Sequence, residues 1–261
     1  YMVGEKVVVL GSGDIGLIMA RRLTLEGAEV IMVAEKLPYS SGLPRNINQC
    51  LHDFDIPLLL SHTVVDIKGN GRLSEVTIAQ LGKRGGIIPQ SKRKIACDTL
   101  LLSVGLIPEN ELSREAGITL DNITGGPQVD ERGQTSIPGI FSCGNVLQVH
   151  DIVDNVSLEA EYIVEGVVEY LKGKLTKERE IKVELGSGLR YVVPQTLIRV
   201  KNTIFSFRVN QPGQKKVLIF EESGRLIKKK SLRWVTPAEM VRVKLSSSEL
   251  DGIKTLKVRL V

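Results

Sequence analysis

The order of apolar and polar positions near the start of the chain predicts a strand, a helix and a second strand. Residues 7–10 and 30–34 are short continuous apolar runs rich in β-branched side chains, as is typical of strands buried in a parallel sheet. Between them, apolar residues from 17 to 25 recur near helical period, and Gly27 follows as a stop signal. We therefore expect a parallel α/β sheet to begin here.

Further short apolar or alternating runs extend this domain to about residue 105. They predict strands at residues 57–60, 64–67, 73–81, 93–98 and 99–104. The third and fourth of these can pair as a small antiparallel ribbon inserted into the parallel-sheet domain, whereas the last should run parallel to the first strand of the chain. The spacing of Ile47, Leu51 and Phe54 on one face predicts a helix over residues 45–54.

The middle of the chain carries a weaker pattern. Residues 106–130 are rich in loop-forming glycine and proline, and a short strand is predicted at residues 140–143. Apolar residues at helical spacing then predict a long helix over residues 155–171, with Gly173 after its end.

The C-terminal part changes to a two-residue period. Apolar residues alternate with charged or polar ones in five short runs, separated by turn formers, at residues 203–209, 216–220, 225–228, 240–245 and 255–260. This pattern predicts an all-β sandwich with one solvated face.

Charge divides the chain at nearly the same place. Residues 176–261 contain 19 Lys/Arg and 8 Asp/Glu, a net charge of +11, while residues 1–175 carry a net charge of −6. Lys228, Lys229, Lys230 and Arg233 form a basic cluster, which is either a solvated strand end or a surface for an anionic partner. Aromatic residues are few and are not interleaved with the basic ones, which excludes nucleic acid as the expected partner.

The turn after the first strand has the G-x-G-x-x-G spacing, with Gly11, Gly13 and Gly16 at the three glycine positions. In this motif the first glycine allows a sharp turn, the second lets a pyrophosphate approach the backbone, and the third lets the helix pack closely on the strand. The helix also directs unpaired N–H groups and the positive end of its dipole at the phosphates. The turn therefore predicts a dinucleotide site, against the alternative of a purely structural glycine-rich turn.

Glu35 ends the second strand, 19 positions after Gly16, where an acid accepts hydrogen bonds from an adenosine ribose. Its carboxylate would repel a 2′-phosphate, so we expect NAD(H) to be preferred over NADP(H). The predicted NAD-binding residues are Gly11, Ser12, Gly13, Asp14, Ile15, Gly16, Glu35 and Lys36.

Gly105 follows the strand at residues 99–104 and has two interpretations. A glycine opposite the first turn would let the nicotinamide half of the cofactor come close to the backbone; the alternative is a simple turn glycine.

The apolar runs, cysteines and histidines restrict the expected cellular location and the kinds of site. No apolar run in this sequence is long enough to cross a membrane, and we expect no secretory signal before the first strand. Cys50, Cys97 and Cys143 form no CxxC pair, and the three histidines are scattered, so we expect no metal site, no disulfide framework and a reducing cytoplasm.

These motifs together resemble the pyridine nucleotide–disulfide oxidoreductase superfamily of two-dinucleotide flavoproteins. The stretches that carry the resemblance are GSGDIGLIMARRLTLEGAEV (11–30), SVGLIPENEL (103–112), TSIPGIFSCGN (135–145) and CGNVLQVHDIVDNVSLEAE (143–161). Within the superfamily the chain is most similar to flavoproteins associated with anaerobic glycerol-3-phosphate dehydrogenase or opine oxidase. The resemblance covers residues 6 to about 171.

The resemblance implies further site residues. Val64 would flank the adenine, Gly105 would lie near the nicotinamide, and Gly144 and Asn145 would meet the ribityl-phosphate region of FAD. The family usually has Asp where this chain has Asn145. Cys143 is interpreted as core packing rather than as a redox thiol.

The resemblance also implies the domain order. We expect an NAD-binding Rossmann-like domain at 1–105, a returning segment of an FAD-binding domain at 106–175, and a basic all-β domain at 176–261. One G-x-G-x-x-G occurs where the family has two, so we expect a fragment that lacks the first FAD half and is inactive alone. Its returning segment would be covered by a neighbouring chain, packed against the β domain, or poorly ordered.

The function implied is hydride transfer between NAD(H) and FAD in the intact protein. No catalytic acid or base is assigned, although His150 and Asp151 are the nearest polar candidates. The partner would be a small-molecule substrate or a redox subunit in protein–protein contact, and glycerol 3-phosphate, an amino acid or opine, and a thiol stay open as substrates. The alternative is a non-catalytic nucleotide-binding or assembly subunit that docks a partner protein.

Overall fold

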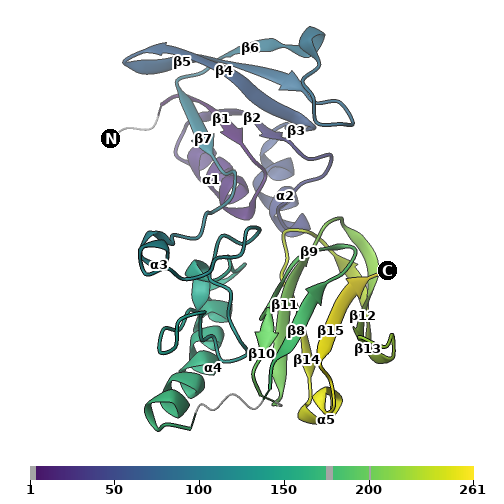
Figure 1. Cartoon of the computed structure of the whole chain (residues 1–261). Coiled ribbons are helices and arrows are strands. Elements are labelled where there is room, and N and C mark those ends of the chain that lie inside the picture. The colour runs from purple at the N-terminus through teal and green to yellow at the C-terminus, as the bar shows by residue number, and fades with distance from the viewer. Residues whose placement is uncertain (1–3, 175–178, 200) are drawn as a thin grey trace. The chain divides into compact units, whose positions relative to one another are not determined.

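The computed structural model describes residues 4–174, 179–199 and 201–261. The chain divides into two compact units, Tyr1–Gly105 and Leu106–Val261, which we call the N-terminal and C-terminal units (Figure 1).

A four-stranded parallel sheet forms the centre of the N-terminal unit. Its order is β3 (Leu58–Leu60), β2 (Glu29–Glu35), β1 (Lys6–Leu10) and β7 (Thr99–Leu102), and each neighbouring pair runs parallel. This confirms the Rossmann-like sheet predicted from the short apolar runs. β7 pairs directly with β1, so the segments that follow these two strands leave the sheet at the same edge.

The two faces of this sheet are covered by different layers. On one face, Val7 and Val9 share a core with Leu17 of α1 (Asp14–Leu25) and Cys50 of α2 (Pro44–Cys50). The intervening Val8 points the other way, because successive side chains of a strand alternate between faces. It packs against an antiparallel ribbon instead.

The ribbon confirms the predicted antiparallel insertion. It consists of β4 (His62–Asn70), β5 (Arg72–Gln80) and β6 (Arg93–Ala96), in that order, with a 3-10 turn, η2 (Pro89–Ser91), before β6. Val76 and Ile78 of β5 are fully buried against the parallel sheet.

The helix predicted over residues 45–54 is wrong at its C-terminal end. α2 stops at Cys50, and a 3-10 turn, η1 (His52–Phe54), follows. Asp55 then takes a left-handed conformation with φ 52°, and the N–H of Ile56 donates to the carbonyl of Leu51. The chain tightens here because it must reverse direction within a few residues to enter β3.

The C-terminal unit begins with short elements and one long helix: α3 (Glu111–Glu115), η3 (Gly144–Val146) and α4 (Val153–Leu171). The strand predicted at residues 140–143 is wrong. Phe141 makes an isolated bridge with Gln134, and no strand of the described residues lies beside it to form a sheet. The apolar side chains of residues 140–143 pack near α4 instead, with Phe141 edge-on to Tyr170.

Two facing sheets form the rest of this unit, in agreement with the alternating pattern. One has the order β10 (Thr196–Leu197), β8 (Ile181–Leu185), β15 (Thr255–Leu260), β12 (Gly213–Glu221) and β13 (Leu226–Val235); the other has the order β14 (Val241–Leu245), β11 (Thr203–Val209) and β9 (Leu189–Val193). Phe205 and Phe207 of β11 share one core with Ile219 and Val258 of the first sheet. A short helix, α5 (Ser247–Leu250), begins with a capping box from Ser246 and Glu249. Strands β8, β9 and β10, and the parallel pairing of β8 with β15, were not predicted.

The segment before the sandwich packs against it. Ile163 of α4 shares a core with Tyr191 and Val193 of β9, and with Val129 and Leu147 from the preceding loops. This is one of the three outcomes expected for the returning segment. The expected boundary between residues 175 and 176 lies outside the described residues, and the three-domain division itself stays a prediction.

Candidate nucleotide-binding site

The glycine-rich turn joins β1 to α1 and lies against Ser103, which follows β7. Gly11 has φ +95°, and a Cβ there would lie 2.1 Å from the carbonyl oxygen of Ser103. A Cβ on Gly16 would lie 2.5 Å from the Cβ of Ser103. Both positions therefore require glycine for the fold itself, since the neighbouring segment occupies the space that a side chain needs.

Gly13 differs from these two glycines. It has φ −64°, which any residue can adopt, and a Cβ there would make only an ordinary contact, 3.4 Å from the Ser103 Oγ. The fold does not need a glycine at this position. Its bare backbone is the feature that a pyrophosphate would use, as the motif requires of its second glycine.

The first turn of α1 is tied to the segment after β2. The carboxylate of Asp14 accepts hydrogen bonds from the N–H of Leu43 at 2.8 Å and from the Asn46 amide at 2.7 Å. The side chain of Ile15 is 72% exposed. The N–H of Gly16 donates to the Ser103 Oγ at 3.0 Å, so Ser103 satisfies one of the N–H groups that a helix leaves unpaired at its start.

Glu35 lies beside the turn with its side chain 5% exposed. Its carboxylate accepts three short hydrogen bonds, from the N–H of Ser12 at 2.9 Å, from the Ser12 Oγ at 2.5 Å and from the N–H of Leu37 at 2.8 Å. Lys36 is exposed. The predicted residues 11–16 and 35 are therefore brought together at the carboxyl ends of β1 and β2, where open α/β sheets bind ligands.

Sequence reasoning missed two parts of this site. Ser103 was one, although a small polar residue directly after a strand parallel to β1 is a signal that could have found it. The loop after β2 was the other. Ser41 donates its N–H to the Ser12 Oγ at 3.0 Å, and Ser40 donates its hydroxyl to the Ser12 carbonyl at 3.3 Å.

Two other predicted residues lie elsewhere in the N-terminal unit. Val64 is on β4, opposite Ile78, and packs into the core between the ribbon and the parallel sheet. Gly105 has φ +101°, and among the described residues no atom outside Gly105 and its two chain neighbours lies within 4 Å of the position that a Cβ would take, so its backbone conformation alone accounts for a glycine. Contact of Val64 with adenine and of Gly105 with nicotinamide stay predictions.

The predicted FAD residues are bonded within the C-terminal unit. Gly144 has φ +71° and donates its N–H to Glu159 Oε2 at 2.6 Å, while Asn145 Oδ1 accepts the N–H of His150 at 3.0 Å. Glu159 also accepts hydrogen bonds from Gln148 at 2.8 Å and from the His150 ring at 3.0 Å. In this structure Glu159 takes the Gly144 donor, and contact of Gly144 and Asn145 with a flavin stays a prediction.

The polar candidates next to this segment have structural partners. Asp151 forms an ion pair with Arg208 of β11 and accepts the N–H of Met240 at 2.7 Å. Burial raises the pKa of the Cys143 thiol, which packs beside the core that α4 shares with β9. These contacts hold the two parts of the C-terminal unit together.

Comparison with known proteins decides the family. The pyridine nucleotide-disulphide oxidoreductase family model matches residues 2–162, well over half of the chain. The chain belongs to this family. Its relatives are FAD- and NAD(P)-dependent oxidoreductases, in agreement with NAD and FAD as cofactors of the intact protein.

The chain covers only part of the length of each relative. The chain is 34% identical over 174 residues to mitochondrial dihydrolipoyl dehydrogenase of Caenorhabditis elegans, which covers 63% of this chain and 33% of the relative. It is 28% identical over 154 residues to NADH oxidase of Methanocaldococcus jannaschii, covering 57% and 31%. It thus spans about a third of the length of these curated relatives.

A solved structure has a similar fold over part of the chain. Thioredoxin reductase of T. acidophilum matches with a TM-score of 0.54 and 23% identity, over 64% of this chain and 52% of that one. In the described part of the chain, no helix has the length and apolar character needed to cross a membrane.

Proposed function

We propose that the N-terminal unit is the NAD(H) site of a flavin-dependent oxidoreductase, in which hydride passes between NAD(H) and FAD in the intact protein. The family relationship and the glycine-rich turn support this proposal. The nicotinamide and the flavin supply the redox chemistry when bound, and the protein supplies binding, orientation and electrostatics.

The observation that carries the proposal is the position of Glu35 beside the glycine-rich turn. A ribose hydroxyl that reaches this carboxylate would add to its hydrogen bonds from Ser12 and Leu37. A 2′-phosphate would instead meet a buried negative charge, which favours NAD(H) over NADP(H). Ser12 would hold the carboxylate in place, and Gly13 would leave room for the pyrophosphate.

The flavin would require a change around Gly144 in the intact protein. We infer that a ligand oxygen takes the Gly144 N–H in place of Glu159, and that Asn145 meets the ribityl chain as a neutral partner. The motifs at residues 103–112 and 143–161 favour relatives associated with anaerobic glycerol-3-phosphate dehydrogenase or opine oxidase. A small-molecule substrate or a redox subunit, and a cytoplasmic location, belong to the same proposal.

The substitution Gly13→Ala tests the nucleotide site without disturbing the fold. The methyl group would make an ordinary contact with Ser103, so the melting temperature should stay close to that of the wild type. It would fill the space that the pyrophosphate needs, so NADH affinity, measured by fluorescence titration, should fall about tenfold or more. Glu29→Gln, which changes an exposed carboxylate at the other end of β2, is the matched control.

Unchanged NADH affinity in a folded Gly13→Ala variant would contradict the site. A second measurement addresses the chemistry: NADH added without oxygen to intact protein that contains flavin should remove the absorbance of the oxidised flavin. Tight NADH binding without flavin reduction would favour the alternative of a nucleotide-binding assembly subunit.

A further inference from the structure

A pocket lies wholly within the C-terminal unit, between α4 and the sheet that contains β9, β11 and β14. Its volume is about 320 Å³, which lies within the usual range of small-molecule sites, about 300–1,000 Å³. Its walls are mostly apolar and include Leu147, Leu158, Ile163, Val193 and Ile204.

Two buried acceptors in this pocket lack a hydrogen-bond donor. Glu131 is 2% exposed and Gln148 is 1% exposed, and both line the pocket. Among the described residues, Glu131 Oε1 and Gln148 Oε1 have no hydrogen-bond partner. Buried polar atoms are almost always paired, so two unpaired acceptors in one pocket indicate a ligand that donates hydrogen bonds.

The charge of the pocket favours a cation. In the described part of the chain, three carboxylates line it, from Asp130, Glu131 and Glu159, against one guanidinium, from Arg242. Glu159 already accepts three hydrogen bonds, and Arg242 donates to Asn155 Oδ1 at 2.9 Å. Glu131 therefore offers the carboxylate oxygen that a ligand can use.

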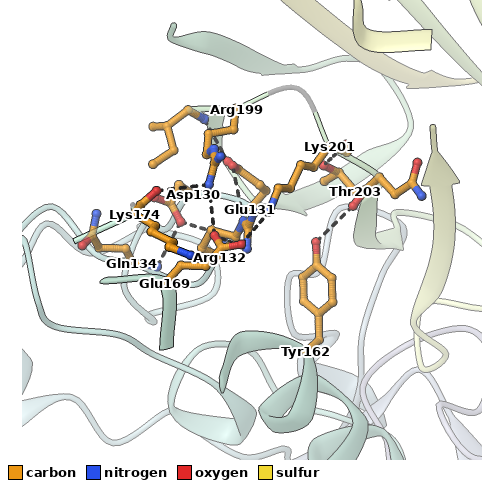
Figure 2. A network of polar contacts seen from close by, with 12 residues as sticks. Asp130, Glu131, Arg132, Gln134, Tyr162, Glu169, Lys174, Arg199, Lys201 and Thr203 are labelled. Atoms are coloured by element: carbon orange, nitrogen blue, oxygen red, sulfur yellow. Dashed lines mark hydrogen bonds and ion pairs between the residues drawn. The ribbon is translucent and has the colours of Figure 1, made fainter. Parts of the chain in front are cut away.

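The groups around Glu131 are charged on several sides (Figure 2). Glu131 Oε2 accepts the N–H of Ile198 at 2.8 Å. The Nε of Arg132 is 3.8 Å from Oε1, too far for a hydrogen bond, and its guanidinium bonds Glu169 of α4 at 2.8 Å instead. The other titratable groups labelled in this cluster are Asp130 in the same loop, Tyr162 of α4, Lys174 after α4, and Arg199 and Lys201 before β11.

We propose that this pocket binds a small primary amine as its ammonium ion, with the charged head against Glu131 and Gln148 and an apolar body along the pocket walls. An ammonium carries three donors and no acceptor, which matches two unpaired acceptors in a negatively charged, apolar pocket. The site shares no residue with the glycine-rich turn. Gln148 and Glu159 also belong to the hydrogen-bond network at Gly144 that a bound flavin would change, so the amine is tested on the chain without flavin.

The ligand class is tested on the full chain by calorimetric titration. 2-Phenylethylamine is the probe, 2-phenylethanol is its neutral analogue and 3-phenylpropionate is its anionic analogue. The amine should bind. The alcohol should bind at least about tenfold more weakly than the amine, and the acid should not bind. Equal or tighter binding of the alcohol or the acid, or no binding of the amine at millimolar concentration, would overturn the proposal.

Variants locate the amine. In Glu131→Gln the side-chain oxygen can still accept the N–H of Ile198, which turns the amide NH₂ toward the ligand and should lower amine affinity at least about tenfold. Glu222→Gln, an exposed change, is the matched control and should leave binding unchanged. Gln148→Met removes the second acceptor, and its amine affinity is measured instead if Glu131→Gln does not fold. Wild-type affinity in a folded variant at either position places the amine elsewhere.

The pH dependence gives an independent readout. Burial raises the pKa of Glu131 to about 7, so the carboxyl is largely protonated at pH 6 and must lose its proton to pair with an ammonium. Amine affinity should therefore be about tenfold weaker at pH 6 than at pH 8, with proton release at the lower pH. Glu131→Gln should abolish this dependence, and a dependence that persists there would contradict the assignment.

Discussion

Ser12 gives both of its hydrogen-bond donors to the same carboxylate oxygen of Glu35, the N–H at 2.9 Å and the hydroxyl at 2.5 Å. The acid that is expected to bind the adenosine ribose therefore also shapes the glycine-rich turn. Any test of Glu35 has to separate these two contributions.

Replacing Glu35 should reveal both effects. Glu35→Ala is expected to weaken NADH binding by about 1–3 kcal/mol, because the ribose hydroxyls lose their acceptor. It also leaves two donors of Ser12 unpaired, so the melting temperature should fall. The measurements are fluorescence titration with NADH and a thermal melt of the same sample, with Glu29→Gln as the control on the same strand.

The wild-type protein should bind NADH more tightly than NADPH, because the 2′-phosphate would face the buried Glu35 carboxylate. Competition of the two nucleotides in one fluorescence assay measures this preference. Tighter NADPH binding would overturn it, and the exposed Lys36 and the serines at 40 and 41 would then be the groups to examine as phosphate partners.

A pair of substitutions tests the close packing of α1. Gly16→Ala would place a methyl group 2.5 Å from the Ser103 Cβ, so we expect a loss of about 1–3 kcal/mol in the free energy of unfolding from overpacking. Removing the opposing side chain with Ser103→Gly should restore part of this loss, as denaturant unfolding of the single and double variants would measure. Strict additivity of the two single effects would show that the residues do not interact.

The elements with a strong local pattern could be predicted from sequence. Strands β1, β2 and β7 are short, continuous apolar runs, and the ribbon and most sandwich strands alternate clearly. The strand at residues 140–143 has the same local signal but no neighbouring strand in the described chain, and a strand exists only by pairing. The helix at residues 45–54 ended early because tertiary geometry required a turn that periodicity does not encode.

The nucleotide-binding site could be predicted only where its residues form a local pattern in the sequence. Glycine spacing and the acid at the end of β2 are local features of one segment, so they could be read from the sequence. Ser103, which follows β7 and lies 87 residues after Gly16, contacts the turn, and that adjacency follows only from the order of the sheet. The pocket at Glu131 depends on packing between α4 and the sandwich, which no local pattern specifies.

Stability of the C-terminal unit should fall as the pH rises from about 5 to 7. Glu131 has an unfolded pKa of 4.5 and a folded pKa of about 7, raised by burial, so the unfolded chain binds fewer protons in this window. The linked loss is about 3 kcal/mol at pH 8, at about 1.4 kcal/mol per pKa unit. Thermal melts at several pH values measure it.

Glu131→Gln should remove most of this slope, while the surface change Glu222→Gln should leave it. Burial also raises the pKa of Asp130, which adds a contribution of the same sign. The pKa of Glu169 is lowered by its Lys201 and Arg132 partners against burial, and its linked effect falls below pH 4.5, outside the window. A flat or rising stability between pH 5 and 7 would contradict the assignment.

The two units should unfold as separate transitions in a calorimeter, since each has its own core. NADH should raise the midpoint of the N-terminal unit, and the pH change should act on the C-terminal unit. A single transition that shifts as a whole with either NADH or pH would show that the units are energetically coupled.

The position of β13 gives its lysines a role that does not require a partner. β13 is the last strand in the described order of its sheet, and it carries Lys228, Lys229 and Lys230 in succession. A strand at this position presents unpaired N–H and C=O groups on which another chain could add a strand. Lys228 forms an ion pair with Glu249 at 3.0 Å. The like charges of Lys229 and Lys230 from two copies of this strand would repel, so we expect them to disfavour edge-to-edge pairing of concentrated protein.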